Sequence, residues 1–143
     1  MTEDHIAGTG MLRLALACRR FQKRLGMGTD LSATEIICLL ILYLEDLKSV
    51  SELSSIVDLS CTSTSKILSK LQNKKYIETT FDSSDRRKER VVLTQLGREM
   101  SENLLTRSRE LTLEVLSGLP DNMKKEFAKW VQWNSVDNSG EST

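Results

Sequence analysis

The feature that most constrains the fold is a change of hydrophobic period at residues 74–77. Before this point, residues 61–74 repeat their apolar side chains at helical spacing. After it, residues 77–81 alternate like a half-buried strand, and residues 90–93 form a second strand-like run. The residues between the two strands, 82–89, are too charged to be buried. The sequence therefore predicts a helix followed by a β-hairpin with a basic tip.

A pair of short helices is expected around this change of period. The capping box Ser49-Val50-Ser51-Glu52 opens the first helix, which stops near Asp58-Leu59. Ser60 then caps the helix over residues 61–74. Two short helices joined by a tight turn form a helix-turn-helix. The segment therefore predicts a winged helix-turn-helix in which the hairpin is the wing.

Longer helices are expected on both sides of this segment. Residues 6–27 carry apolar side chains at alternating spacings of three and four, the seam of a helix that packs on another helix. A capping box at 32–35 starts a very apolar helix that extends to about Leu47. Further helices are expected over 94–117 and about 120–134. The fold class is therefore mostly α (α+β), with a two-stranded β wing.

The composition agrees with one helical domain that does not enter a membrane. The 143 residues are 39% hydrophobic and include one Pro and seven Gly, so the chain has few helix breakers. The longest apolar stretch, Ile36 to Leu44, has nine residues, whereas a membrane-spanning helix needs about 20. Residues 1–5 are acidic and lack the basic region of a signal peptide. A cytoplasmic location is expected.

Basic charge is concentrated on the predicted helix-turn-helix and wing. The whole chain has 20 basic and 20 acidic residues. The segment 62–90 has eight Lys and Arg against four Asp and Glu, a net charge of +4, which leaves −4 for the rest of the chain. Neutralisation of phosphates supplies most of the non-specific affinity for DNA. This segment therefore has the polarity of a DNA-facing surface.

The helix over 61–74 carries side chains suited to reading DNA. Small hydroxyl groups let a helix approach the major groove closely, and they bond to base edges or phosphates. Lys66 is the best candidate for a base or phosphate contact, and Lys70 for a phosphate clamp. The alternative to a DNA-binding face is an ordinary solvated helix face. The presence of the adjoining basic wing favours the DNA-binding face. The candidate DNA-binding residues of this helix are Thr62, Ser63, Ser65, Lys66 and Lys70.

The wing tip adds three basic candidates, Arg86, Arg87 and Lys88. An arginine suits a narrow minor groove, where the negative potential is enhanced. Asp85 is interpreted as a brace that pairs with a neighbouring arginine and fixes the loop. The alternative for Asp85 is a surface ion pair that contributes less than roughly 1 kcal/mol.

A family signature runs from the wing tip into the following helix. It is the run Asp85-Arg86-Arg87-Lys88-Glu89-Arg90-Val91-Val92-Leu93-Thr94-Gln95-Leu96-Gly97. This run resembles the D-x-R-x(5)-L-T-x-x-G signature of MarR-type winged helix-turn-helix transcriptional regulators at every fixed position. The likeness continues upstream through 31–35, 51–53 and 70–77, so it covers about residues 31–100.

The resemblance implies a homodimer that binds double-stranded DNA at a palindromic operator, usually as a repressor. In such proteins the second arginine of the motif, here Arg87, enters the minor groove, and Asp85 braces the wing. Small phenolic or other anionic aromatic effectors typically bind between the dimer and DNA lobes and weaken DNA binding. The effector of this chain and the residues that would bind it are unknown, and no cofactor is expected.

The resemblance also implies an organisation for the whole chain. The first and last helices of such proteins form the dimer interface, and the helix after the wing links it to the DNA-binding lobe. The chain is therefore expected to be a single domain with five parts. These are dimerisation helices at 6–27 and 119–134, a winged lobe at 31–93, a linking helix at 94–117 and a flexible tail at 135–143.

One position departs from the family pattern. Many members have glycine where this chain has Lys75, just before the first wing strand. If the backbone is left-handed there, lysine costs roughly 1 kcal/mol more than glycine. The helix dipole partly offsets this cost, because a cation is favoured at a helix C-terminus.

The three cysteines are widely spaced and are expected to be reduced thiols. Cys18 and Cys38 are most simply buried small hydrophobes. Cys61 opens the candidate recognition helix, where a thiolate is favoured. A thiol-based redox-sensing regulator, in which oxidation of Cys61 disturbs DNA contact, is therefore one alternative. In that case the Cys61→Ser variant would keep its DNA binding under peroxide, whereas the wild type would lose it. His5 is the only histidine and no Cys/His cluster exists, so no metal site is expected.

Two function classes compete with the regulator. An enzyme needs a nucleophile–base pair, a carboxylate pair or a phosphate loop, and none is readable. A winged-helix protein–protein interaction module without DNA binding would lack the wing arginines and the recognition-helix lysines, which this chain has. Trp130 and Trp133 could line a ligand pocket, although an aromatic pair on a terminal helix more often packs in an interface.

Overall fold

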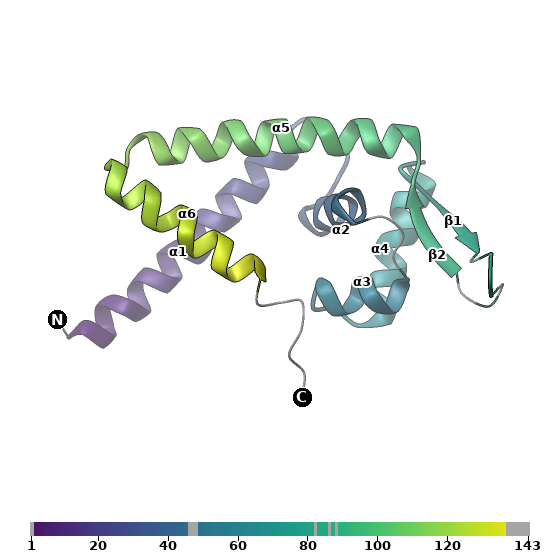
Figure 1. Ribbon diagram of the computed structural model, residues 1–143, viewed down its shortest axis with the longest axis horizontal. Helices are drawn as coiled ribbons and strands as arrows, with labels where there is room; N and C mark the ends of the chain where they lie inside the picture. The colour runs from purple at the N-terminus through teal and green to yellow at the C-terminus, as the bar shows by residue number, and fades with distance from the viewer. Residues whose placement is uncertain (1, 46–48, 82, 86, 88, 137–143) are drawn as a thin grey trace. The chain divides into compact units, whose positions relative to one another are not determined.

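The computed structural model describes residues 2–45, 49–81, 83–85, 87 and 89–136. It has the expected order of helices with a hairpin between the fourth and fifth (Figure 1). The elements are α1 (Glu3–Gly26), α2 (Ala33–Leu44), α3 (Val50–Ile56), α4 (Cys61–Asn73), β1 (Ile77–Phe81), β2 (Glu89–Leu93), α5 (Gln95–Ser117) and α6 (Asp121–Val136). The second helix ends at Leu44, before the predicted end at about Leu47, because Glu45 leaves the helical backbone at φ −129°. Leu47 itself lies outside the described residues.

The chain divides into two compact units after Ser108. The first unit contains the core of the winged lobe, where α2 contacts α4 and β2, and α3 contacts α4. Its largest fully buried hydrophobic side chains are those of Leu39, Leu53, Leu71 and Leu104. Burying a leucine stabilises a fold by roughly 2 kcal/mol. The apolar helix α2 therefore takes the central position that its sequence predicts.

The wing is a two-stranded antiparallel sheet. Ile77 pairs with Leu93, Thr79 with Val91, and Phe81 with Glu89. Ile77, Val91 and Leu93 are buried. The face that carries these three side chains therefore holds the base of the hairpin against the lobe.

Helix α4 is followed by a left-handed residue, Lys75, at φ +66°. The Lys75 amide donates to the carbonyl of Gln72 at 2.9 Å, and the Tyr76 amide donates to the carbonyl of Leu71 at 3.0 Å. These two bonds define a Schellman motif, in which glycine is the usual left-handed residue. The backbone at this position therefore has the left-handed conformation that glycine adopts most readily.

Helix α3 ends in the same way at Asp58, whose φ is +54°. The Asp58 amide donates to Ser55 at 3.4 Å and the Leu59 amide donates to Ser54 at 3.0 Å. Aspartate tolerates this conformation better than most residues. Asp58 therefore provides the sharp turn between the two helices of the helix-turn-helix.

The junction between β2 and α5 is built on the carbonyl oxygen of Tyr76. The Thr94 amide donates to that oxygen at 3.0 Å. The Thr94 hydroxyl donates to the carbonyl of Lys75 at 2.7 Å and accepts from the Gly97 amide at 3.1 Å. A Cβ atom on residue 97 would lie 2.0 Å from the Tyr76 oxygen. The hydrogen bonds of Thr94 and the lack of space for a side chain at Gly97 therefore explain the threonine and the glycine of the L-T-x-x-G part of the signature.

We expect Gly97→Ala to lower the free energy of unfolding by about 3 kcal/mol, because overpacking against rigid backbone forces the junction apart. Urea denaturation followed by circular dichroism measures the change. Gly118→Ala is the matched control, since a Cβ there meets nothing within 4 Å. Equal stability of the two variants would contradict this account of the junction.

We expect Lys75→Gly to raise the free energy of unfolding by about 1 kcal/mol, because glycine removes the cost of the left-handed backbone. The greater entropy of glycine in the unfolded chain offsets part of this gain. Lys70→Gly is the control, because it lies inside α4 and should lose about 1 kcal/mol. A loss of stability in Lys75→Gly would show that the Lys75 side chain matters more than its backbone.

Candidate nucleic-acid interface

The polar face of α4 is exposed over its whole length. The buried side of the helix consists of Thr64, Leu68 and Leu71. All five candidate contacts from this helix lie on the exposed side: Thr62, Ser63, Ser65, Lys66 and Lys70. The structure therefore brings these residues together on one accessible face of a single rigid element.

Two hydroxyl groups organise the start of this face. The Ser60 hydroxyl accepts from the Ser63 amide at 3.1 Å and lies 3.0 Å from the Ser63 hydroxyl. The fully buried Thr64 donates its hydroxyl to the carbonyl of Ser60 at 2.9 Å. Sequence reasoning missed Thr64 as a core residue, although its spacing from Leu68 and Leu71 places it on their side.

The wing residues are described in part. Arg87 is exposed, and its backbone amide donates to Oδ1 of Asp85 at 3.0 Å. Asp85 therefore fixes the loop through the main chain of Arg87. The candidates Arg86 and Lys88 lie outside the described residues.

Lys74 belongs to the basic segment but its ammonium group points into the lobe. Its Nζ lies 2.6 Å from Oε2 of Glu35, whose side chain is only 5% exposed. The same Nζ also donates to the carbonyl of Asp30. Lys74 is thus used inside the protein, and the basic surface available to a partner is smaller than the sequence count suggests.

Glu35 does not complete the capping box that its position predicts. The Ser32 hydroxyl accepts from the Glu35 amide at 3.2 Å, so half of the box is present. The Glu35 carboxylate accepts from the Ser32 hydroxyl at 3.2 Å and from Lys74. Pairing with Lys74 takes precedence because a buried carboxylate without a cation is costly.

Tyr76 completes this group of contacts. Its hydroxyl donates to Oδ1 of Asp30 at 3.0 Å. Burial raises the pKa of the Tyr76 hydroxyl, and the hydrogen bond and negative charge of Asp30 raise it further. Tyr76 is therefore a neutral hydrogen-bond donor at physiological pH.

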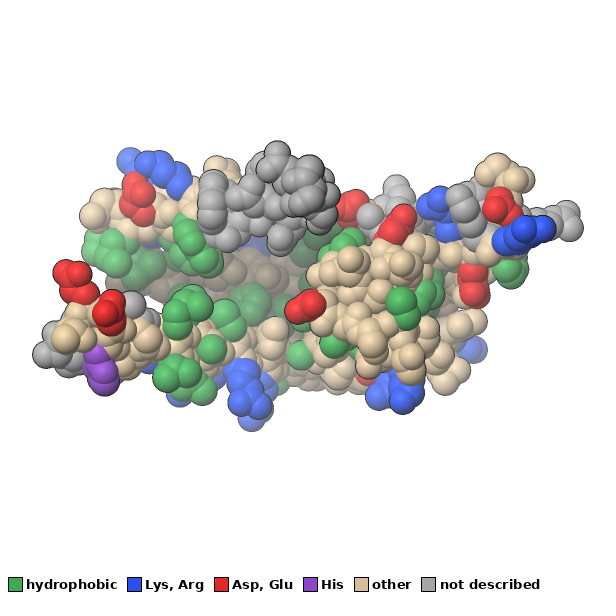
Figure 2. Space-filling model, turned by 90° about the horizontal axis from the view of Figure 1, so that it is seen from below, with side chains coloured by type: hydrophobic (Ala, Val, Ile, Leu, Met, Phe, Trp, Pro, Cys, Tyr) green, Lys and Arg blue, Asp and Glu red, His purple; other side chains and the backbone are tan. Residues whose placement is uncertain are grey.

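The outer part of α1 exposes apolar side chains. Figure 2 shows green hydrophobic groups along the helix that begins beside the purple histidine. Met11 is 68% exposed, Leu14 43% and Leu16 51%. Of the expected seam, only Leu25 is buried within the single chain. Clustered apolar exposure of this kind is typical of protein–protein or membrane interaction sites and of ligand-binding grooves.

Helix α6 also exposes apolar groups. Met123, Phe127 and Trp130 are exposed, and the rings of Phe127 and Trp130 have centroids 6.1 Å apart. The side chain of Trp133 and residues 137–143 lie outside the described parts. The helix runs to Val136, so it extends into the segment that the sequence predicts as a tail.

The three cysteines have different surroundings. Burial raises the pKa of the Cys38 thiol to about 11, and the negative charge of Glu35 adds to the rise. The prediction that Cys38 is buried is confirmed. The prediction that Cys18 is buried was wrong for the single chain, because no other described element covers this side of α1. Cys61 is exposed, and its sulfur lies 3.3 Å from the hydroxyl of Ser54. That hydroxyl already donates to Ser51, so Cys61 is placed to donate its thiol proton.

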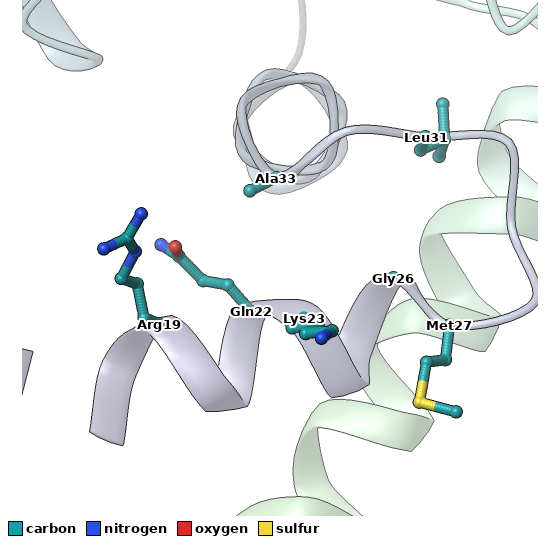
Figure 3. Close-up of a pocket in the computed structure, with 7 residues that line it drawn as sticks. All are labelled: Arg19, Gln22, Lys23, Gly26, Met27, Leu31 and Ala33. Atoms are coloured by element: carbon teal, nitrogen blue, oxygen red, sulfur yellow. The ribbon is translucent and has the colours of Figure 1, made fainter. Parts of the chain in front are cut away.

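A pocket of about 370 Å³ lies between α1 and the first turn of α2. Figure 3 shows Arg19 and Gln22 extending from α1 on the side where Ala33 lies. Two cations, Arg19 and Lys23, line the pocket, so its electrostatic preference is for an anion. The lining residues are Arg19, Gln22, Lys23, Gly26, Met27, Leu31 and Ala33.

Two absences apply to the part of the chain that the structure describes. Among these residues, no group of three or more His, Cys, Asp or Glu side chains could hold a metal ion. None of the helices described here combines the length and the apolar character needed to cross a membrane.

Comparison with known proteins confirms the resemblance found in the sequence. Residues 31–88 match the sequence model of the MarR family. This range contains α2, α3, α4 and β1, which are the elements of the helix-turn-helix and the first wing strand. Members of this family are transcriptional regulators and not enzymes. No curated protein sequence matches the chain.

Solved structures share the fold at low sequence identity. A MarR family protein from Bacillus stearothermophilus has 17% identity and a TM-score of 0.79, over 98% of this chain and 99% of its own. A MarR transcriptional regulator from Methanosarcina mazei Go1 has 19% identity and a TM-score of 0.77, over 94% and 96%. BpsR of Bordetella bronchiseptica, whose DNA binding is regulated by 6-hydroxynicotinic acid, has 21% identity and a TM-score of 0.70, over 89% and 92%. The winged-helix fold is thus confirmed.

Proposed function

Because residues 31–88 match the sequence model of the MarR family, we propose that the protein is a sequence-specific DNA-binding transcriptional regulator. The observation that carries this proposal is the exposed face of α4, where three hydroxyl groups and two lysines stand together. The adjoining wing tip is basic as well. Such a surface combines phosphate neutralisation with groups that bond to base edges.

The proposal assigns a role to each candidate residue. Helix α4 enters the major groove, where Thr62, Ser63, Ser65 and Lys66 reach base edges and Lys70 holds a phosphate. Arg86, Arg87 and Lys88 contact the backbone and the minor groove, with Asp85 as the brace of the loop.

We further propose that the protein acts as a homodimer on a palindromic operator. The support is the exposed apolar surface of α1 and α6, which are the helices where the resemblance expects a dimer interface. A two-fold axis would place two copies of α4 about one turn of DNA apart, in successive major grooves.

We also propose that the protein is a repressor, and that a small anionic aromatic compound releases it from DNA. The pocket beside α1 supports this, because Arg19 and Lys23 favour a carboxylate while Met27 and Leu31 provide apolar wall. The action of 6-hydroxynicotinic acid on BpsR is a precedent for that class of ligand.

We expect selection of random duplex DNA by the purified protein to recover a palindrome. Arg87→Ala should bind it about tenfold more weakly, with a salt dependence reduced by about one ion per protomer. Arg109→Ala is the control, since Arg109 is an exposed arginine of α5 and belongs to neither the helix-turn-helix nor the wing. Failure to enrich any sequence would favour the protein–protein interaction module.

We expect Leu14→Glu to dissociate the dimer, because it places a charge in the apolar surface of α1. Sedimentation equilibrium should give the chain mass of 16.2 kDa for the variant and twice that mass for the wild type. Arg13→Glu changes an exposed neighbour outside the seam and should stay dimeric. A monomeric wild type would refute the dimer.

A further inference from the structure

The segment that joins α1 to α2 forms one wall of the pocket. Met27 and Leu31 of this segment line the cavity, together with Gly26 at the end of α1 and Ala33 at the start of α2. The start of this segment is held in place by Arg107 of α5, whose Nη1 donates to the carbonyls of Leu25 at 2.9 Å and Met27 at 2.5 Å. A molecule in the pocket would therefore press on the residues after this anchored point.

Asp30 lies next to the pocket residue Leu31 and connects the segment to the end of α4. The Tyr76 hydroxyl donates to the Asp30 carboxylate at 3.0 Å, and Lys74 donates to the Asp30 carbonyl. Lys74 also pairs with Glu35 in the first turn of α2 at 2.6 Å. We call Asp30, Glu35, Lys74 and Tyr76 the coupling cluster.

The coupling cluster is connected directly to the DNA-facing elements. Lys74 caps the C-terminus of α4 and Tyr76 immediately precedes β1. The Tyr76 carbonyl accepts from Thr94, which joins β2 to α5, and it leaves no space for a side chain at residue 97. Glu35 is 4% exposed and Tyr76 is 7% exposed, so neither can move without its neighbours. A displacement of Asp30 would therefore disturb its contacts with Lys74 at the end of α4 and with Tyr76 before β1.

We propose that the coupling cluster transmits occupancy of the α1–α2 pocket to the recognition helix and the wing. The proposal rests on the proposed function, because it specifies how an anionic occupant would change DNA binding. In this role Lys74 and Tyr76 are positioning residues that act through α4 and β1. Their contacts differ from those of Lys66 and Lys70, which face outward.

The test fills the pocket without a ligand. Ala33→Trp introduces a large side chain at the pocket wall, and Arg20→Trp adds the same bulk on α1 outside the pocket lining. The cluster is broken by Glu35→Gln combined with Lys74→Met, which removes both charges and leaves no buried carboxylate alone. Circular dichroism checks that each variant is folded.

Affinity for the selected duplex is measured for all four combinations of filled pocket and broken cluster. We expect Ala33→Trp to weaken binding about tenfold with the cluster intact and less than about twofold with it broken. Arg20→Trp should have little effect in either background. Equal losses in both backgrounds, or no effect of Ala33→Trp, would overturn the proposal.

Two further readouts separate the proposal from its alternatives. Glu35→Gln combined with Lys74→Met should leave the salt dependence of DNA binding unchanged, whereas loss of a phosphate contact made by Lys74 would reduce it by about one ion per protomer. In the DNA-free protein, Ala33→Trp should accelerate amide hydrogen exchange at residues 74–81 when the coupling cluster is intact. The same substitution should not accelerate it when the cluster is broken. If no duplex binds, the proposed function fails, and this exchange experiment still decides the coupling.

Discussion

The carbonyl oxygen of Tyr76 is the point on which the geometry of the winged lobe depends. It accepts from the Thr94 amide and lies against the backbone of Gly97, so it fixes where β2 ends and α5 begins. The amide of the same residue closes the C-terminus of α4. One peptide segment therefore sets the relation between the recognition helix, the wing and the helix that follows.

Much of this architecture can be predicted from local sequence. The change of hydrophobic period at residues 74–77 locates the end of α4 and the start of β1 within a residue or two. Ser49 with Glu52 marks the start of α3, and their capping box is complete. These signals work because caps and period depend on neighbours only a few residues apart. The signature from Asp85 to Gly97 adds the identity of the fold.

The contacts that sequence reasoning missed join residues far apart in the chain. Glu35 looks like an ordinary capping glutamate, and Lys74 like part of a basic surface, yet they pair across 39 positions. Cys18 lies on an apolar seam but stays exposed in the single chain. A local pattern indicates which face of a helix tends to be buried. Only the three-dimensional structure shows which residues contact that face.

Among the described residues, the two left-handed ones that are not glycine, Asp58 and Lys75, influence how the sequence can change over generations. Glycine would relieve the backbone at both positions. In the genetic code, an aspartate codon becomes a glycine codon by one nucleotide substitution, whereas a lysine codon needs two. Natural variants that relax this helix-turn-helix are therefore more accessible at the turn between its helices than at the base of its wing.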